Sequence, residues 1–210
     1  MIKKIFQKRE KIAEYFLASI FFPLSIFFVI IIRIIRPIFL VRYAYIISTR
    51  IGEMVENFDF YLCAKKERLF FPKQRFIDIF YLNTYVCNKF FIKMLKKKII
   101  ILPRFLMHPV DKINRFFDKF LDSEDIHTVG RYKKDLTITP KPPWNNRDIY
   151  SFLEKYGPQF EFTNKELDRG YSILKNMGID KCDKFVCLFS RDSEYLKRQY
   201  PTNDWSYHDF

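Results

Sequence analysis

RFIDIFYLNTYVCNKFFIKMLKKKIIIL, residues Arg75–Leu102, contains three apolar segments with different spacing. Arg75–Leu82 is a compact run of aromatic and β-branched residues, which indicates a strand. Across Asn83–Lys98 the apolar residues recur at the spacing of one helical face, and lysines gather at its carboxyl end, where they complement the helix dipole. Ile99–Leu102 indicates a short buried strand. A strand, a helix and another strand in succession predict an α/β fold with a parallel sheet.

Further elements are expected on the amino-terminal side of this stretch. Tyr43–Ser48 is a short run rich in aromatic and β-branched residues and predicts a buried strand, with a turn at Arg50-Ile51-Gly52. Phe58–Cys63 is a candidate for another strand.

The carboxyl-terminal side predicts two helices and one more strand. Residues 105–120 suggest the first helix, and 121–144 are mostly a polar connection. Thr163 and Glu166 fit a capping box for a second helix from Asn164 to Met177, with Gly178 as its stop. Lys184–Ser190 predicts a buried strand whose carboxyl end is followed by charged residues. Ligands bind at that end of the strands in open α/β sheets.

The charge of the chain is concentrated in its first part. The 210 residues carry a net charge of +13, and residues 1–120 hold 23 Lys and Arg against 9 Asp and Glu. The hydrophobic share of 49% excludes a disordered basic tail. A basic surface of this kind suits nucleic acid, an anionic lipid face or phosphate-bearing substrates.

A hydrophobic segment, Tyr15–Ile32, lies within this basic region. It has eighteen uncharged residues with lysines and arginines on both sides, so it is long enough to span a bilayer. Pro23 in its middle also allows a kinked helix that lies in the membrane surface. The alternatives are a helix buried in the protein core and a cleaved signal peptide. No small-residue cleavage site precedes Arg33, which disfavours the signal peptide.

Several chemistries lack their sequence patterns. The cysteines, at positions 63, 87, 182 and 187, are too scattered for a metal site and are expected to be free thiols in a reducing compartment. The three histidines have no ligand-like spacing, so no metal is expected. The chain contains no G-x-S-x-G, G-x-G-x-x-G or Walker motif and no RNP-type aromatic motif.

Two loops are candidates for chemistry. The first follows the Tyr43–Ser48 strand, where Gly52 permits close backbone approach and Arg50, Glu53 and Asn57 crowd one turn. A carboxylate there suits a general base, with Glu53 preferred over its neighbour Glu56 because it lies nearer the strand end. The alternative is a turn that only starts an amphipathic helix.

The second candidate loop follows the Lys184–Ser190 strand. Arg191 suits a diphosphate through bidentate hydrogen bonds, with Asp192 holding the guanidinium or capping the next segment. Tyr195 and His208 belong to the same aromatic and polar region. The alternative is an internal ion pair between Arg191 and Asp192.

Three strings resemble a family of bacterial glycosyltransferases that act in surface-carbohydrate biosynthesis. They are STRIGEMVENFDFYLCA from Ser48, YVCNKFFIKMLKKKI from Tyr85, and FVCLFSRDSEYL from Phe185 followed by DWSYHDF. The similarity covers residues 41–210. One departure is Glu53, since a histidine often follows the glycine of R-I-G in that family.

The resemblance implies a two-domain, GT-B-like architecture with Rossmann-like domains. It divides the chain into an apolar membrane-associating helix (1–40), an acceptor-side domain (41–145), a connection with a helix (146–183) and the start of a donor-binding domain (184–210), so the chain is expected to be an amino-terminal portion of a longer enzyme. The family's chains continue beyond the H-D-F segment.

The function expected on this basis is sugar transfer from a nucleotide-sugar to a surface glycan or a lipid-linked acceptor, at the cytoplasmic face of the inner membrane. Glu53 would be the base, Arg50, Gly52 and Asn57 would bind the acceptor, and Arg191, Asp192, Tyr195 and His208 would bind the donor. No cofactor and no nucleic-acid partner are expected. The rival reading is a non-enzymatic, membrane-tethered basic module that binds anionic lipid or nucleic acid.

Overall fold

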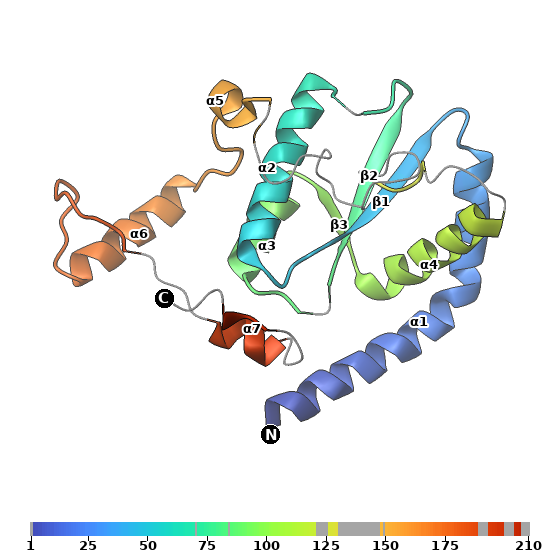
Figure 1. Cartoon of the computed structure of the whole chain (residues 1–210), viewed down its shortest axis with the longest axis horizontal. Helices are drawn as coiled ribbons and strands as arrows, with labels where there is room; N and C mark the ends of the chain where they lie inside the picture. Colours follow the sequence, from blue (N-terminus) through green and yellow to red (C-terminus); the bar gives the residue numbers. More distant parts are fainter. Residues whose placement is uncertain are drawn as a thin grey trace. The chain divides into compact units, whose positions relative to one another are not determined.

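The chain divides into two compact units, Met1–Glu161 and Phe162–Phe210. The computed structural model describes residues 2–69, 71–83, 85–120, 126–129, 148, 150–188, 193–199 and 204–206 (Figure 1).

A parallel three-stranded sheet lies in the middle of the first unit. Its strands are β1 (Leu40–Ile46), β2 (Phe76–Leu82) and β3 (Ile100–Leu102), in the order β1-β2-β3. Leu40 pairs with Phe76 and Ile79 with Ile100, so the strands run side by side in the same direction. This confirms the predicted α/β class, and the architecture is consistent with a Rossmann-like fold.

Helices cover both faces of this sheet (Figure 1). The helices of the first unit are α1 (Ile2–Ile34), α2 (Ile51–Glu67), α3 (Lys89–Lys96), α4 (Arg104–Phe120) and α5 (Phe152–Tyr156). Ala44 and Ile46 of β1 pack against α2 and α3, whereas Val41 and Tyr43 pack against α1 and α4. Successive side chains of a strand point to opposite faces, so β1 contributes to two separate hydrophobic cores.

Helix α2 corrects one expectation, because Phe58–Cys63 is helical and forms no strand. Met54, Phe58 and Tyr61 are each about 1% exposed and recur at the i, i+4, i+7 spacing of a helical face. A parallel pair of strands also needs a crossover connection, which α2 supplies between β1 and β2. The aromatic residues of this segment therefore pack on the sheet without belonging to it.

Helix α3 is shorter than the expected Asn83–Lys98. It begins at Lys89, where the side chain of Asn88 accepts a hydrogen bond from the Phe91 amide at 2.9 Å. An asparagine cap of this kind satisfies an amide that the helix leaves without a partner.

Residues 126–129 lie along the outer side of β1. The Tyr43 amide donates to the carbonyl of His127 at 2.8 Å, and the Val129 amide donates to the Tyr43 carbonyl at 3.1 Å. The His127 ring Nδ1 contacts the Val41 carbonyl at 2.7 Å, and burial lowers the pKa of this imidazole. The segment covers backbone groups that an edge strand would otherwise expose.

The carboxyl half of α1 packs on the sheet and on α4. Val29 and Ile32 are almost fully buried there. Arg33 donates to the Asn114 side-chain oxygen from Nε at 3.0 Å and from Nη2 at 2.7 Å, and it pairs with Asp118. These polar contacts fix α1 to the protein body.

Helices α1 and α4 run in the same direction. Phe21 of α1 lies beside Phe105 of α4, with ring centroids 5.5 Å apart. Nearer the carboxyl ends of the same two helices, Arg33 of α1 contacts Asn114 of α4. Because α4 starts where β3 ends, the amino half of α1 extends beyond the carboxyl edge of the sheet (Figure 1).

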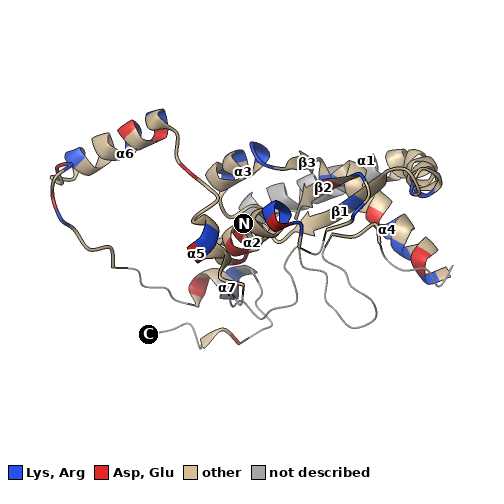
Figure 2. Ribbon diagram, turned by 90° about the horizontal axis from the view of Figure 1, so that it is seen from above, with Lys and Arg blue, Asp and Glu red and all other residues tan. Residues whose placement is uncertain are grey.

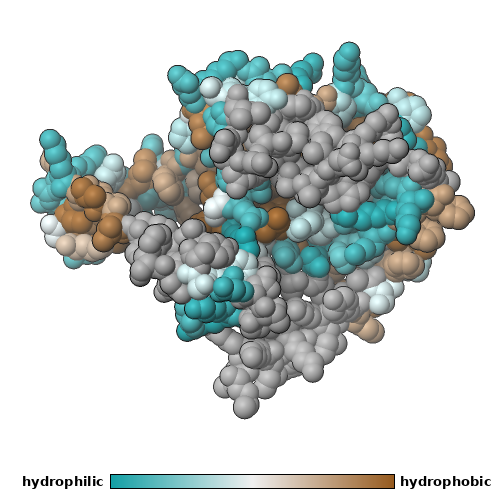
Figure 3. All heavy atoms as spheres, viewed as in Figure 1, coloured by the Kyte–Doolittle hydropathy of each residue, from teal (hydrophilic) through white to brown (hydrophobic). Residues whose placement is uncertain are grey.

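The face of α1 turned away from the body carries exposed apolar side chains. Here we call this row the α1 stripe, and it consists of Phe16, Ile20, Leu24, Phe27, Ile31 and Ile34, all 37–71% exposed. Brown, apolar atoms gather at the side of the molecule where α1 and α4 lie (Figure 3). On the other side of the helix, Phe21 and Phe28 are half-buried. Within the described residues, no helix has the length and apolar character needed to cross a membrane.

The second unit contains α6 (Asn164–Asn176) and α7 (Glu194–Gln199). Thr163 and Glu166 form the predicted capping box, with the Thr163 amide 2.8 Å from the Glu166 carboxylate, and Gly178 takes a φ of +82° after the helix. The expected buried strand is wrong over 184–188, since no strand forms there and Val186 and Leu188 are 94% exposed. An apolar run becomes a strand only beside a neighbouring strand, and the described part of this unit has none.

Candidate functional site: the carboxyl edge of the parallel sheet

The loops that follow β1 and β2 are joined at the carboxyl edge of the sheet. The Ser48 hydroxyl donates to the Tyr85 carbonyl at 2.6 Å, and the Ser48 carbonyl accepts from the Cys87 amide at 2.8 Å. The Asn83 amide donates to the Ile46 carbonyl at 3.2 Å. Ser48 is fully buried, so these bonds form a rigid base for the residues that follow it.

Arg50 and Glu53 lie next to this base, at the amino end of α2. Arg50 is the N-cap residue with extended backbone, and its Nη1 donates to Glu53 Oε1 at 2.9 Å. Both side chains are about one third exposed, 37% and 34%. The helix end adds a favourable potential for negative groups. A cation and a carboxylate are therefore accessible together at the edge where open α/β sheets bind ligands.

The backbone of Gly52 is not closely approached in the described part of the chain. This residue is exposed, and a β-carbon added to it meets no atom of the described part of the chain within 4 Å. The role of Gly52 in acceptor binding stays a prediction, and close backbone approach does not support it.

Asn57 does not share the edge with Arg50 and Glu53. It lies two helical turns into α2, about 10 Å along the helix axis from Arg50 at 1.5 Å per residue. Only 5% of Asn57 is exposed, and its side-chain oxygen has no hydrogen-bond partner among the described residues. The four residues predicted for the acceptor side therefore separate into an accessible pair, an exposed glycine and a buried amide.

The donor-side predictions lie mostly beyond what the structure describes. Arg191, Asp192 and His208 fall outside the described residues, and Tyr195 lies in α7 with 39% exposure. Their donor-binding roles stay predictions.

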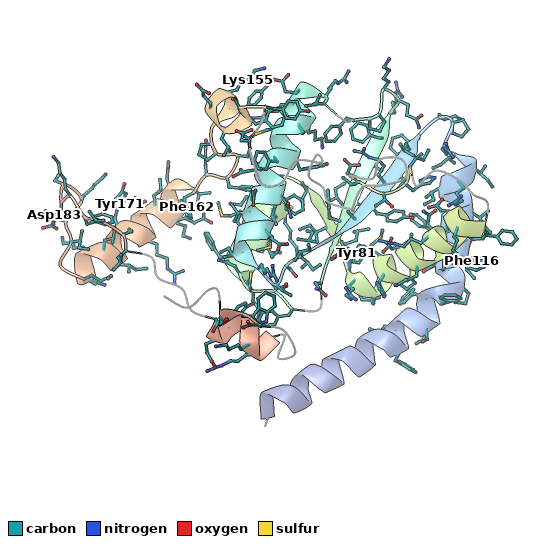
Figure 4. The ribbon with its side chains drawn as sticks, in the orientation of Figure 1. Tyr81, Phe116, Lys155, Phe162, Tyr171 and Asp183 are labelled. Atoms are coloured by element: carbon teal, nitrogen blue, oxygen red, sulfur yellow. The ribbon has the colours of Figure 1, made fainter. Side chains whose placement is uncertain are left out.

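The structure adds polar residues on the α1 and α4 face of the same edge, which the sequence analysis did not single out. Tyr81, near the carboxyl end of β2, donates its hydroxyl to Asp111 at 2.7 Å, and Arg115 donates to the other oxygen of Asp111 at 2.8 Å. The His108 ring lies edge-on to Tyr81 with centroids 6.3 Å apart. Figure 4 places Tyr81 between the sheet and α4.

The surroundings of His108 favour its neutral imidazole. Burial is the main cause that lowers its pKa below 6.5, and the positive charges of Arg104 and Lys112 lower it further. The ring is half-buried in the second turn of α4, close to the end of β3. His108 lies near the start of a helix that directly follows a strand. This position in the sequence would have identified it as a candidate site residue.

Comparison of this chain with protein-family models, with curated protein sequences and with solved structures found no match.

Within the part of the chain that is described, no group of three His, Cys, Asp or Glu side chains is arranged to hold a metal ion. Of the cysteines, Cys63 is buried in the core, while Cys182 and Cys187 are exposed and unbridged.

Proposed function

We propose that the chain is part of a glycosyltransferase that moves a sugar from a nucleotide-sugar donor to a surface glycan or a lipid-linked acceptor. On this proposal the first unit is the acceptor-side domain of a two-domain, GT-B-like architecture. The observation that carries it is the accessible pair of Arg50 and Glu53 at the carboxyl edge of a parallel sheet.

The reaction is a displacement at the anomeric carbon of the donor sugar. The acceptor hydroxyl oxygen forms a bond to that carbon, and its proton passes to the carboxylate of Glu53. The bond from the carbon to the diphosphate oxygen breaks, and the electron pair leaves with the nucleoside diphosphate. Arg191 offsets the charge that develops on this leaving group. Arg50 holds the Glu53 carboxylate at the sheet edge until the acceptor hydroxyl replaces Arg50 as the hydrogen-bond donor to Glu53.

The membrane is the second part of the proposal. Helix α1 lies along the cytoplasmic face of the inner membrane with its stripe in the lipid, because its opposite face is already buried against the body at Val29 and Ile32. Basic residues of the first 120 positions favour anionic headgroups by about 1 kcal/mol for each residue near the surface. Since α1 extends past the carboxyl edge, this orientation brings Arg50 and Glu53 near lipid-linked acceptors.

The test is the release of nucleotide from a panel of nucleotide-sugars by the full-length enzyme that contains this chain, measured with a bacterial lipid extract and glycan acceptors. E53Q keeps the shape of the side chain and removes its basicity, so we expect turnover to fall about 100- to 10,000-fold. E154Q is the matched control, since Glu154 is an exposed carboxylate on α5 away from the edge. It should retain the wild-type rate.

Two results would count against this proposal. An E53Q rate within about threefold of wild type removes Glu53 from the role of base. Absence of acceptor-dependent turnover by the full-length enzyme with every nucleotide-sugar of the panel contradicts the transferase proposal.

A second candidate is a non-enzymatic basic module that binds anionic lipid, and the charge of residues 1–120 favours it. Co-sedimentation with anionic vesicles in rising salt distinguishes the two modes of binding. Purely electrostatic binding collapses as salt screens it, whereas an inserted α1 stripe stays bound.

A further inference from the structure

A basic pocket lies at the opposite, amino-terminal edge of the sheet. It has a volume of about 330 Å³ and opens between the starts of β2 and β3 and the carboxyl ends of α2 and α3. Four lysines line it together with apolar and aromatic side chains: Lys65, Lys96, Lys97 and Lys98. Figure 2 shows the basic stretch at the end of α3 in blue. This pocket is separate from the Arg50 and Glu53 pair, which lies at the other edge.

The floor of the pocket is a neutralised ion pair. Asp78 accepts hydrogen bonds from Nε and Nη2 of Arg42, each at 2.7 Å, and from the Tyr61 hydroxyl at 2.7 Å. The rings of Phe71 and Phe76 lie 5.0 Å and 4.8 Å from the guanidinium carbon. Asp78 is the acidic residue among those that line the pocket, and its charge is already balanced by Arg42. It therefore offers no counter-charge to the lysines.

Helix dipoles explain only part of the lysine cluster. The carboxyl ends of α2 and α3 each act like about half a negative charge, so together they offset about one unit of positive charge. Lys65 lies on α2, whereas the other three lysines are the last residue of α3 and the two residues that follow it. The ammonium group of Lys65 lies 5.9 Å from the Tyr61 ring. The chain thus brings positive charge to this pocket from two elements that are more than thirty residues apart.

We propose that this pocket binds a multiply charged phosphate anion of the diphosphate class. Lysine ammonium groups bind phosphate as point charges, and cations on two sides of a pocket suit a ligand with two charged groups better than a single phosphate. The volume is at the lower end of the range for ligand pockets, about 300–1,000 Å³. The anion comes from solution, because the pocket lies on the α2 and α3 face of the sheet while the apolar side chains of α1 lie on the other.

The test is calorimetric titration of the whole chain with inorganic pyrophosphate at low salt. K65Q/K98Q removes one lysine from α2 and one from the turn that follows α3, and we expect it to weaken binding about tenfold or more by removing two charge-assisted contacts. The matched control is K66Q/K93Q, which removes the same charge from α2 and α3 at positions that do not line the pocket. It should bind pyrophosphate as the wild type does. All four lysines are exposed, so both variants are expected to keep the wild-type thermal midpoint.

A second measurement uses only the wild-type protein. Pyrophosphate should protect the four pocket lysines from an amine-acylating reagent, read by mass spectrometry, and leave Lys66 and Lys93 at their unprotected rate. Equal weakening in both double variants, equal protection of all lysines, or no binding of pyrophosphate overturns the proposal.

The source of the anion is tested with neutral vesicles that carry a small fraction of phosphatidylinositol phosphate. If K65Q/K98Q weakens binding to these vesicles while soluble pyrophosphate does not bind, the pocket recognises a headgroup and the assignment to a soluble anion is wrong. None of these readouts depends on sugar transfer, so the pocket and the transferase proposal fail separately.

Discussion

The α1 stripe gives the sharpest quantitative prediction, which concerns F16S/F27S. Phe16 and Phe27 are 67% and 61% exposed. Full burial of a phenylalanine side chain is worth about 1.5–3 kcal/mol, so inserting these exposed fractions into lipid contributes about 1–2 kcal/mol for each residue. Their joint loss, about 2–4 kcal/mol, should lower the partition coefficient into vesicles about 30- to 700-fold.

The assay is flotation with vesicles of phosphatidylcholine and phosphatidylglycerol at about 0.5 M NaCl, where exposed charges are largely screened. F162S/F185S is the matched control, because those phenylalanines are 56% and 52% exposed but lie in the second unit. Figure 4 labels Phe162 at the start of α6. We expect the control to partition like the wild type. An unchanged partition coefficient for F16S/F27S, or equal losses in both variants, refutes insertion of the α1 stripe.

Three further predictions follow from buried groups. Asp78→Asn leaves a buried guanidinium without its carboxylate and should lower the free energy of unfolding by about 3–5 kcal/mol in urea denaturation; a loss below about 1 kcal/mol contradicts a tight buried pair. Burial lowers the pKa of His108 and His127 below 6.5, so the unfolded chain takes up protons first. Their contribution to stability is complete above that pH and is lost as the pH falls through the folded-state pKa values. The free energy of unfolding should therefore depend differently on pH in wild type and in H127Q between about pH 5 and 8. Parallel pH dependences in the two proteins would contradict this contribution. Burial raises the pKa of Cys63 to about 11, so iodoacetamide near pH 8 should label Cys182 and leave Cys63 unmodified until the protein unfolds.

The sequence correctly predicted those elements whose signals lie within a few neighbouring residues. Arg75–Leu82 and Ile99–Leu102 became β2 and β3 almost unchanged, because each is a short apolar run bounded by residues that end it. The capping box at Thr163 and Glu166 depends on bonds within four residues and was also predictable.

The errors concern elements whose state depends on distant partners. Phe58–Cys63 is as aromatic as a strand, and only the crossover between β1 and β2 shows that it must be a helix. Phe185 and the residues after it have a strand's composition but no neighbouring strand in the described part of the second unit. Composition predicts which side chains are buried, whereas the neighbouring element determines whether the backbone forms a helix or a strand.

The candidate site shows the same limit. The position of Arg50 and Glu53 followed from a strand that ends near Ile46, so the pair was predictable. The burial of Asn57 and the proximity of His108 to Tyr81 depend on how α2 and α4 pack on the sheet. No short motif carries that information.

The attachment of α1 to α4 also has a consequence for the order of events during synthesis. Arg33 leaves the ribosome long before its partner, since 81 positions separate it from Asn114. At about 5–20 residues per second, the ribosome needs about 4–16 s to make the intervening chain. Throughout this interval the apolar side of α1 that later faces Val110 and Ile113 has no protein surface to cover it. If α1 associates with the membrane as proposed, a nascent chain that reaches the bilayer in this interval would assemble its sheet on a helix that is already anchored.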